Sequence, residues 1–231
     1  MFTFGDQGWG DELAVGAGMT LLIAAASLAF GLLLGLLGAG AKLARSRWLN
    51  ALGEAYTTLI RGVPELLVIF LIFFGGGFLL QAAAEFVGYE GYVEVDAFVA
   101  GVFALSLVFG AFATEVFRGA FLAVPVGQVE AARALGMPPF LTLRRILLPQ
   151  VWRHALPGLG NLWLVLVKDT SLVSVIALDE LARKTQIAVG VEKEPFTLYM
   201  AAALIYCAIT LASSLGQGRL ERWAARGVRR A

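Results

Sequence analysis

The chain has 231 residues, of which 59% are hydrophobic, and its formal net charge is +1. Soluble domains are about 45–50% apolar, so this composition indicates an all-α integral membrane protein that passes through the bilayer several times. The near-zero net charge argues against nucleic acid as a partner. The single cysteine, Cys207, excludes a disulfide within the chain. We expect one transmembrane domain over residues 1–231.

Long, mostly uncharged runs mark the expected membrane spans, because a helix needs about 20 apolar residues to cross a bilayer. No basic stretch of the kind that opens a signal peptide precedes the first run, so that run is expected to stay in the mature protein. Glycines in the first run offer small-residue faces for packing against a neighbouring helix; they are Gly31, Gly35, Gly38 and Gly40. The five expected transmembrane helices cover residues 13–41, 60–84, 97–123, 154–176 and 195–218.

The charges between the spans predict how the chain is oriented, because Lys and Arg near span ends stay on the cytoplasmic side. With five spans, the basic residues of 42–47, of 127–150 and of the tail 219–231 fall on one side of the membrane. The acidic residues of 1–12 and 85–96 fall on the other side. We therefore expect the N-terminus outside and the C-terminus inside.

Residues 127–150 form the only long polar insertion between the two apolar halves, and they are expected to contain two short helices. The first would cover 129–135 and stop at Gly136, because glycine favours the backbone conformation that ends a helix. The second would cover 140–148 and end at Pro149. Small side chains on the first helix let another backbone approach closely, so the segment is typical of a surface held by a partner. An ordinary loop between membrane helices is the alternative.

Ionisable residues inside a membrane span are costly, and they are functional candidates by default. Arg61 and Glu65 are spaced i and i+4 around Pro64, which predicts a kink and a charged pair that lines a path or a gate. The alternative is that Arg61 lies at the membrane interface and extends toward the head groups. Glu115 and Arg118, spaced i and i+3, are expected to neutralise each other and to help pack helices.

The fourth span contains the third charged cluster, Lys168 and Asp169. Adjacent residues do not face each other on a helix, so each of these charges needs another partner or a wet cavity. We therefore expect the pair to line the transport pathway. Asn161, seven residues before Lys168, falls on the same helix face as that lysine.

The sequence offers no set of residues for catalysis. His154 is the only histidine and lies far from Cys207 in the sequence, so the chain lacks the residues for a nucleophile–base–orienter triad. Neither a metal-ligand spacing nor a glycine loop that ends in Gly-Lys-Ser/Thr is present. The chain is therefore expected to be no enzyme, to hold no metal or cofactor, and to leave any ATP chemistry to a separate protein.

The spacing within 127–150 resembles the EAA loop of ABC importer permeases, which docks into a cleft of the ATP-hydrolysing subunit and transmits its motion. The residues that carry the resemblance are Glu130, Ala131, Ala132, Gly136, Ile146, Leu148 and Pro149. The resemblance implies a cytoplasmic coupling loop over 127–150. The residues implied to couple to the ATPase are Glu130, Ala131, Ala132, Gly136, Arg144 and Arg145.

Most of the chain resembles the membrane subunits of polar amino acid ABC importers, in the histidine and lysine–arginine–ornithine branch that includes octopine and nopaline permeases. The matching stretches include YTTLIRGVPELL, TEVFRGAFLAVPVGQVEAARALG and ALPGLGNLWLVLVKDTSLVS. The resemblance implies a type I importer fold in the bacterial inner membrane and a basic amino acid as cargo, such as histidine, arginine, lysine or ornithine. The implied partners are a homologous permease in a heterodimer, two cytoplasmic ATPase subunits that bind ATP and Mg, and a periplasmic or tethered binding protein.

One position departs from the family pattern. In relatives that handle cationic amino acids, an acidic residue often follows the asparagine of the fourth span, whereas Leu162 follows Asn161 here. The resemblance thus implies that the partner permease supplies the main specificity contact, although Asp169 can still meet a cationic group. Two other functions compete with an importer subunit. One is a subunit of an ion-gradient-driven carrier with ion sites at Glu115 and Asp169, and the other is a membrane scaffold that transports nothing.

Overall fold

The computed structural model describes residues 2–3, 5, 8–89 and 91–224, and every regular element within them is helical. Five helical stretches are long and apolar enough to cross a membrane, as predicted. They are Gly10–Leu43, Glu65–Phe86, Ala97–Leu122, Pro139–Ile176 and Pro195–Ala224. Several of the charges used to predict the orientation lie outside the described residues, namely Asp6, Glu90, Arg226, Arg229 and Arg230.

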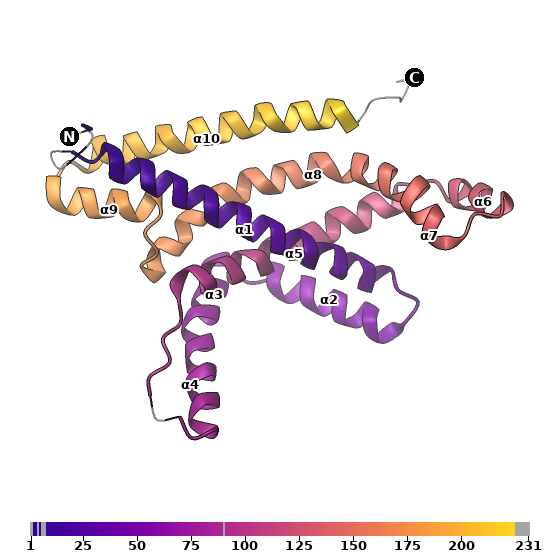
Figure 1. Ribbon diagram of the computed structural model, residues 1–231, viewed down its shortest axis with the longest axis horizontal. Coiled ribbons are helices and arrows are strands. Elements are labelled where there is room, and N and C mark those ends of the chain that lie inside the picture. Colours follow the sequence, from indigo (N-terminus) through magenta and orange to yellow (C-terminus); the bar gives the residue numbers. More distant parts are fainter. Residues whose placement is uncertain (1, 4, 6–7, 90, 225–231) are drawn as a thin grey trace.

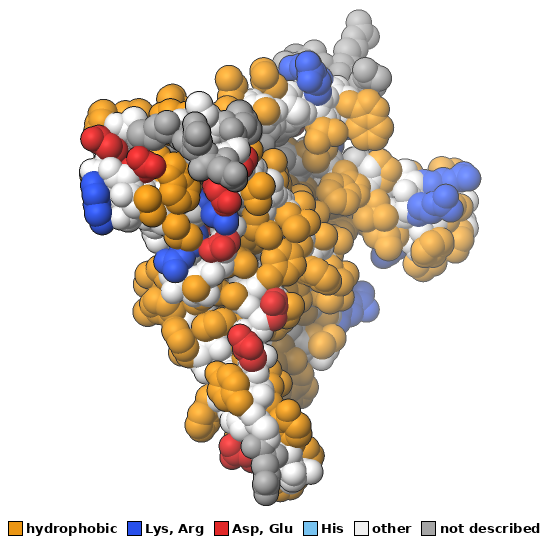
Figure 2. All heavy atoms as spheres, turned by 60° about the vertical axis from the view of Figure 1, so that its left-hand side comes forward, with side chains coloured by type: hydrophobic (Ala, Val, Ile, Leu, Met, Phe, Trp, Pro, Cys, Tyr) orange, Lys and Arg blue, Asp and Glu red, His pale blue; other side chains and the backbone are white. Residues whose placement is uncertain are grey.

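Two helices form the centre of the molecule, α1 (Gly10–Leu43) and α5 (Ala97–Leu122), which run side by side in the same direction (Figure 1). Helix α2 (Arg47–Arg61) turns back along both of them. Helix α8 (Leu148–Asp169) packs against α5, and α10 (Pro195–Ala224) lies along α8. Figure 2 shows hydrophobic side chains over much of one face of this body, as a surface in contact with lipid requires.

The close packing of α1 on α5 rests on glycines, as their spacing in the first span predicted. A Cβ atom on Gly35 would lie 2.7 Å from the Cβ of Ala113, so a larger residue there would force the two helices apart. Gly40 faces open space and takes no part in the packing. The three close approaches pair Gly31 with Phe109, Gly35 with Ala113, and Gly38 with Thr114.

The second predicted span, 60–84, starts later than predicted, at Glu65, and it contains a bend. Helix α2 ends at Arg61, and the predicted kink at Pro64 is confirmed as a full interruption before α3 (Glu65–Phe70). A π-helical turn at Leu71–Gly75 then leads into α4 (Gly76–Phe86), which leaves the body at a steep angle (Figure 1). A widened turn followed by small residues is a usual cause of such a bend.

The fourth predicted span begins earlier than expected. Helix α7 (Pro139–Thr142), a π-helical turn at Leu143–Leu147 and α8 form one helical run that continues to Ile176. The prediction that Pro149 ends the second short helix is therefore wrong. Pro149 falls in the first turn of α8, directly after the π-helical turn, and a proline is tolerated at that position because it needs no N–H partner there.

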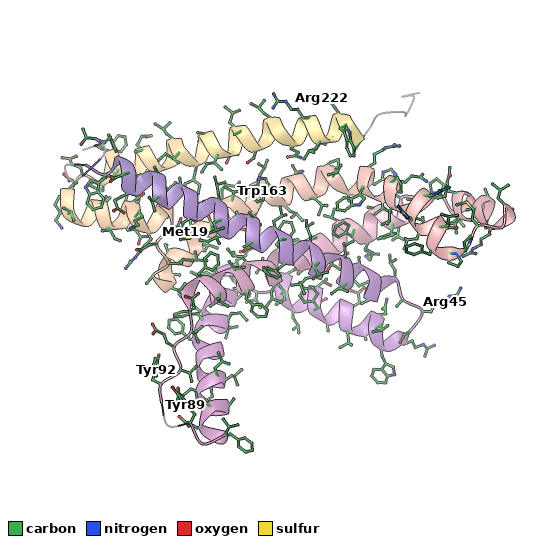
Figure 3. All side chains as sticks on the ribbon, viewed as in Figure 1. Met19, Arg45, Tyr89, Tyr92, Trp163 and Arg222 are labelled. Atoms are coloured by element: carbon green, nitrogen blue, oxygen red, sulfur yellow. The ribbon has the colours of Figure 1, made fainter. Side chains whose placement is uncertain are left out.

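Two ends of the molecule differ in composition. Helix α6 (Val126–Ala134), α7 and the turn that contains Arg45 lie at one end, and Arg222 lies at the end of α10 on the same side (Figures 1 and 3). Helix α9 (Leu181–Glu192) and the start of α1 lie at the opposite end. The basic residues of 42–47, of the exposed loop 127–150 and of the end of α10 therefore lie at one end, whereas Arg183 and Lys184 of α9 lie at the opposite end.

Helix α9 lies between the fourth and fifth spans, and a buried acidic residue starts it. Glu180 is 0% exposed, and its carboxylate accepts the N–H groups of Ala182 at 2.9 Å and Arg183 at 2.8 Å. The same carboxylate accepts the Tyr206 hydroxyl at 2.9 Å and the Thr20 hydroxyl at 3.3 Å. Burial raises the pKa of Glu180, although these hydrogen bonds oppose the change. One side chain thus joins α1, α9 and α10.

We predict that Gly35→Leu destabilises the chain because the added side chain has no room between α1 and α5. Overpacking of this kind costs about 1–3 kcal/mol of the free energy of unfolding. Gly40→Leu is the matched control, since a Cβ atom at Gly40 meets nothing within 4 Å. Denaturant titration of the detergent-solubilised protein measures both. Equal stability of the two variants would contradict the packing role of Gly35.

Candidate functional site

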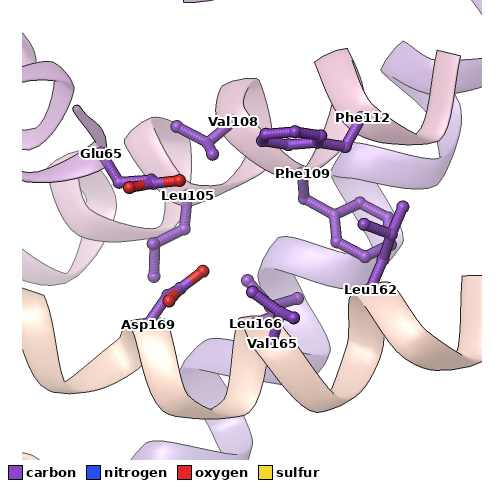
Figure 4. Close-up of a pocket in the computed structure, with 9 residues that line it drawn as sticks. All are labelled: Glu65, Leu105, Val108, Phe109, Phe112, Leu162, Val165, Leu166 and Asp169. Carbon is purple, nitrogen blue, oxygen red and sulfur yellow. The ribbon is translucent and has the colours of Figure 1, made fainter. Parts of the chain in front are cut away.

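A pocket opens between α3, α5 and α8, with an empty volume of about 510 Å³ that includes space open to solvent. Pockets that hold small molecules have mostly apolar walls with a few polar groups. Figure 4 shows the residues that line this pocket. They are Glu65 from α3; Leu105, Val108, Phe109 and Phe112 from α5; and Leu162, Val165, Leu166 and Asp169 from α8.

The two carboxylates of this pocket lie at one end of it. In Figure 4 Glu65 and Asp169 extend from opposite walls toward the same space, whereas Phe109, Phe112 and Leu162 close the other end. Like charges in an apolar cavity repel each other, and each loses hydration. A positively charged group between the two carboxylates would remove the repulsion and replace the lost water. The geometry therefore suits a ligand with a cationic group and an apolar part.

Local sequence places both carboxylates. The break at Pro64 makes Glu65 the first residue of α3, where a negative charge is favoured by the helix dipole. Asp169 is the last residue of α8, inside the helical run that continues to Ile176. The chain tightens into a 3₁₀-helix at Thr170–Ile176, and the Thr170 hydroxyl donates to the Val167 carbonyl at 2.8 Å. The two carboxylates thus come from two separate helical runs.

The structure brings only some of the predicted pathway residues together. Glu65 and Asp169 share the pocket, and Leu162 stands in its wall. Lys168 and Asn161 are exposed on α8, and neither lines the pocket. Their common face is therefore available to a neighbouring subunit or to lipid.

Glu115 belongs to a separate ionic cluster between α1, α2 and α5. Its carboxylate forms ion pairs with Lys42, with Arg118 at 3.0 Å and with Arg61 at 3.8 Å. The predicted pairing of Glu115 with Arg118 is confirmed. The predicted pairing of Arg61 with Glu65 is wrong, because the break at Pro64 ends α2 and turns Glu65 into the pocket.

Lys42 is the centre of this cluster, and sequence reasoning had counted it only among the basic residues at the end of the first span. Its side chain is 4% exposed and also contacts Glu54 at 2.8 Å and the Thr57 hydroxyl at 3.0 Å. A lysine at the end of a span, followed by an acidic residue on the next helix, is the sequence signal that could have revealed the cluster. The arrangement satisfies a buried charge completely, so it fixes three helices together rather than leaving an open site.

The loop 127–150 presents most of its predicted coupling residues to solvent. Glu130, Ala131 and Gly136 are exposed, whereas Ala132 is 3% exposed and packs inward. Arg144 and Arg145 are exposed on the π-helical turn. Two large apolar side chains are exposed on the same loop, Leu135 at 81% and Phe140 at 73%. Apolar side chains among exposed polar ones are typical of a surface that contacts another protein.

Gly136 ends α6 as predicted. Its φ angle is +73°, which favours glycine, and its N–H donates to the Arg133 carbonyl at 2.9 Å. The Met137 N–H donates to the Ala132 carbonyl at 3.0 Å, which completes a Schellman motif. This motif fixes the angle at which the chain leaves α6, so the exposed surface of the loop has a defined shape.

Comparison with known proteins finds one family and close relatives. The model of the binding-protein-dependent transport system inner membrane component family matches residues 31–226. The nopaline transport system permease protein NocQ of Agrobacterium fabrum is 54% identical over 99% of this chain and 98% of its own length. The histidine/lysine/arginine/ornithine permease HisQ of Salmonella typhimurium is 42% identical over 97% of this chain and 98% of its own. A solved amino acid ABC transporter with histidines superposes with a TM-score of 0.80 at 33% identity, covering 93% of this chain and 94% of its own.

We predict that Lys42→Met destabilises the chain by about 2–4 kcal/mol, because it leaves the carboxylate of Glu115 without its most buried partner. Arg118→Met removes another partner of the same carboxylate, but the Arg118 side chain is 40% exposed. Its loss is expected to cost under about 1 kcal/mol. Denaturant titration in detergent measures the difference, and a larger effect for Arg118→Met would contradict the central place of Lys42.

Proposed function

Because the chain belongs to the family of binding-protein-dependent transport system inner membrane components, we propose that it forms half of the pathway of an ATP-driven importer for basic amino acids. Family membership makes it an inner-membrane permease subunit of an amino acid ABC importer, with ATP hydrolysis on a separate subunit. The same relationship favours this function over an ion-gradient-driven carrier. What we propose is the identity of the cargo, the orientation of the chain in the membrane and the exact set of partners.

The convergence of Glu65 and Asp169 in one apolar pocket carries the proposal for the cargo. The ammonium or guanidinium group of histidine, arginine, lysine or ornithine would bind between the two carboxylates, and the rest of the molecule would contact the apolar wall. Relatives named for nopaline and for histidine, lysine, arginine and ornithine support a basic cargo. Leu162 gives this part of the wall no charge, so a homologous partner permease would provide a further specificity contact.

The exposed loop 127–150 carries the proposal for coupling. Glu130, Ala131 and Gly136 would contact a cleft of a cytoplasmic ATPase subunit, and Arg144 and Arg145 would form charged contacts at its rim. Ala132 would support this surface from within. The gathering of basic segments at the end of the molecule that carries the loop supports an N-terminus outside and a C-terminus inside. Two ATPase subunits and a periplasmic or tethered binding protein would complete the transporter.

We predict that Asp169→Asn and Glu65→Gln each weaken the apparent affinity for basic amino acids. A hydrogen bond to a charged group contributes about 1.5–3 kcal/mol, so the KM for uptake is expected to rise about 10- to 100-fold. Uptake of arginine, histidine, lysine, ornithine, octopine and nopaline into proteoliposomes that contain the whole transporter measures this. Glu194→Gln is the matched control, because it removes an exposed carboxylate that does not line the pocket.

Leu162→Glu tests the same pocket by adding a carboxylate instead of removing one. A third carboxylate in the wall is expected to strengthen binding of basic amino acids. Unchanged affinity for basic amino acids in all three pocket variants would contradict the assignment of the cargo to this pocket.

We predict that Gly136→Asp leaves membrane insertion intact but lowers the coupling of ATP hydrolysis to uptake by roughly tenfold. The added carboxylate meets nothing within 4 Å in this chain, but the φ angle of +73° strains any residue other than glycine, so the variant changes both the exposed surface and the angle at which the chain leaves α6. Gly88→Asp, after α4, is equally open and has a φ angle of +84°, so it carries the same backbone strain away from the loop and serves as the control. Normal ligand-stimulated ATPase activity with normal uptake in the Gly136 variant would refute the docking role.

A further inference from the structure

One residue connects the pocket to the ionic cluster, the aromatic side chain of Phe112. Its ring forms part of the pocket wall at the end away from the two carboxylates (Figure 4). Phe112 lies on α5, one turn before Glu115, and the chain continues past Glu115 to the loop 127–150. Any ligand that leaves the carboxylates along α5 toward that loop therefore meets the Phe112 ring.

Arg61 holds this ring in place. Its guanidinium carbon lies 5.2 Å from the centroid of the Phe112 ring, within the range of a cation–π contact. A nitrogen of the same guanidinium lies 3.8 Å from the Glu115 carboxylate, one turn further along α5. Arg61 is the last residue of α2 and is not part of the pocket wall. The guanidinium thus lies behind the aromatic end of the pocket and attaches α2 to α5.

We propose that Phe112 and Arg61 together form the inner gate of the pathway, closed in this structure by the cation–π contact. The inference rests on the proposed binding of a basic amino acid between Glu65 and Asp169. The ring blocks the apolar end of the pocket, and the guanidinium behind it repels a cationic ligand that would pass without opening the gate. A relative displacement of α2 and α5 separates the two side chains and opens the path.

The charge pattern suits this role. A basic amino acid moves from two negative groups to an aromatic ring and then meets a positive group. When the gate opens, the same ring face can hold the cationic group of the ligand in place of Arg61, because both are cations of similar chemistry. Glu115 retains Lys42 and Arg118 as partners when Arg61 moves, so no carboxylate is left unpaired.

Cysteine accessibility tests the gate. Val108 lines the pocket and is 5% exposed, and Cys207 is the only native cysteine and is exposed, so Val108→Cys in a Cys207→Ser background provides a single reporter. The complete transporter in everted membrane vesicles is treated with a neutral, membrane-impermeant maleimide, which reaches the pocket only from the loop side. A neutral reagent avoids any direct effect of the Arg61 charge on the probe.

We predict that Arg61→Gln and Phe112→Leu each speed labelling of the reporter by about 2- to 30-fold, which is the rate equivalent of a lost cation–π contact. Phe112→Tyr keeps the ring and is expected to stay within about twofold of the parent rate. Arg118→Gln is the matched control, because Arg118 pairs with the same Glu115 carboxylate, whereas it is the Arg61 guanidinium that lies over the ring.

Two results would overturn the gate. One is labelling of the Arg61→Gln variant at the parent rate, and the other is equal acceleration by Arg118→Gln, which would show that loosening the ionic cluster is sufficient. Protection of the reporter by saturating arginine in the parent transporter is a separate readout. Its absence would count against the cargo site between Glu65 and Asp169, whereas the effects of Arg61 and Phe112 on labelling would still decide the gate.

Discussion

The close packing of α1 against α5 is the constraint on which the rest of the structure depends. Three glycines on α1 let the two backbones approach, and the parallel course of the helices brings Lys42 beside Glu115. Helix α5 is then held on one side by α1 and α2, while Leu105, Val108 and Phe112 remain available to form a pocket with α3 and α8. A looser contact would leave a buried lysine unpaired and would remove the fixed wall of that pocket.

The charges in the apolar body divide into two groups with opposite physical character. Lys42 and Glu115 have several partners each within the chain, so their charge is compensated locally. Glu65 and Asp169 have each other across an apolar cavity, which leaves negative charge to be compensated by something else. A membrane protein can keep the first kind for stability alone, but the second kind costs free energy unless a cation binds.

Features fixed by a single backbone position were predictable from the sequence. Gly136 and Pro64 act through their own φ and N–H constraints, and uncharged length alone identified the five spans. Features that need a distant partner were not. The chain passes through Pro149 because a π-helical turn precedes it, and α9 forms because Glu180 finds donors on three helices. The pocket was predictable in part, since Asp169 and Glu65 were both predicted to line a path, but Glu65 was expected to pair with Arg61.

The helical run from Pro139 to Ile176 gives the molecule a direct mechanical connection between its exposed loop and its pocket. Arg144 and Arg145 lie near the start of this run, and Asp169 lies near its end, on one helical segment. Glu65 belongs instead to α3, which follows a break in the chain. A displacement of the loop by a bound ATPase would therefore move Asp169 relative to Glu65. Under the proposed binding of a cation by both carboxylates at once, that change of separation would alter its affinity without any change in the chemistry of the pocket.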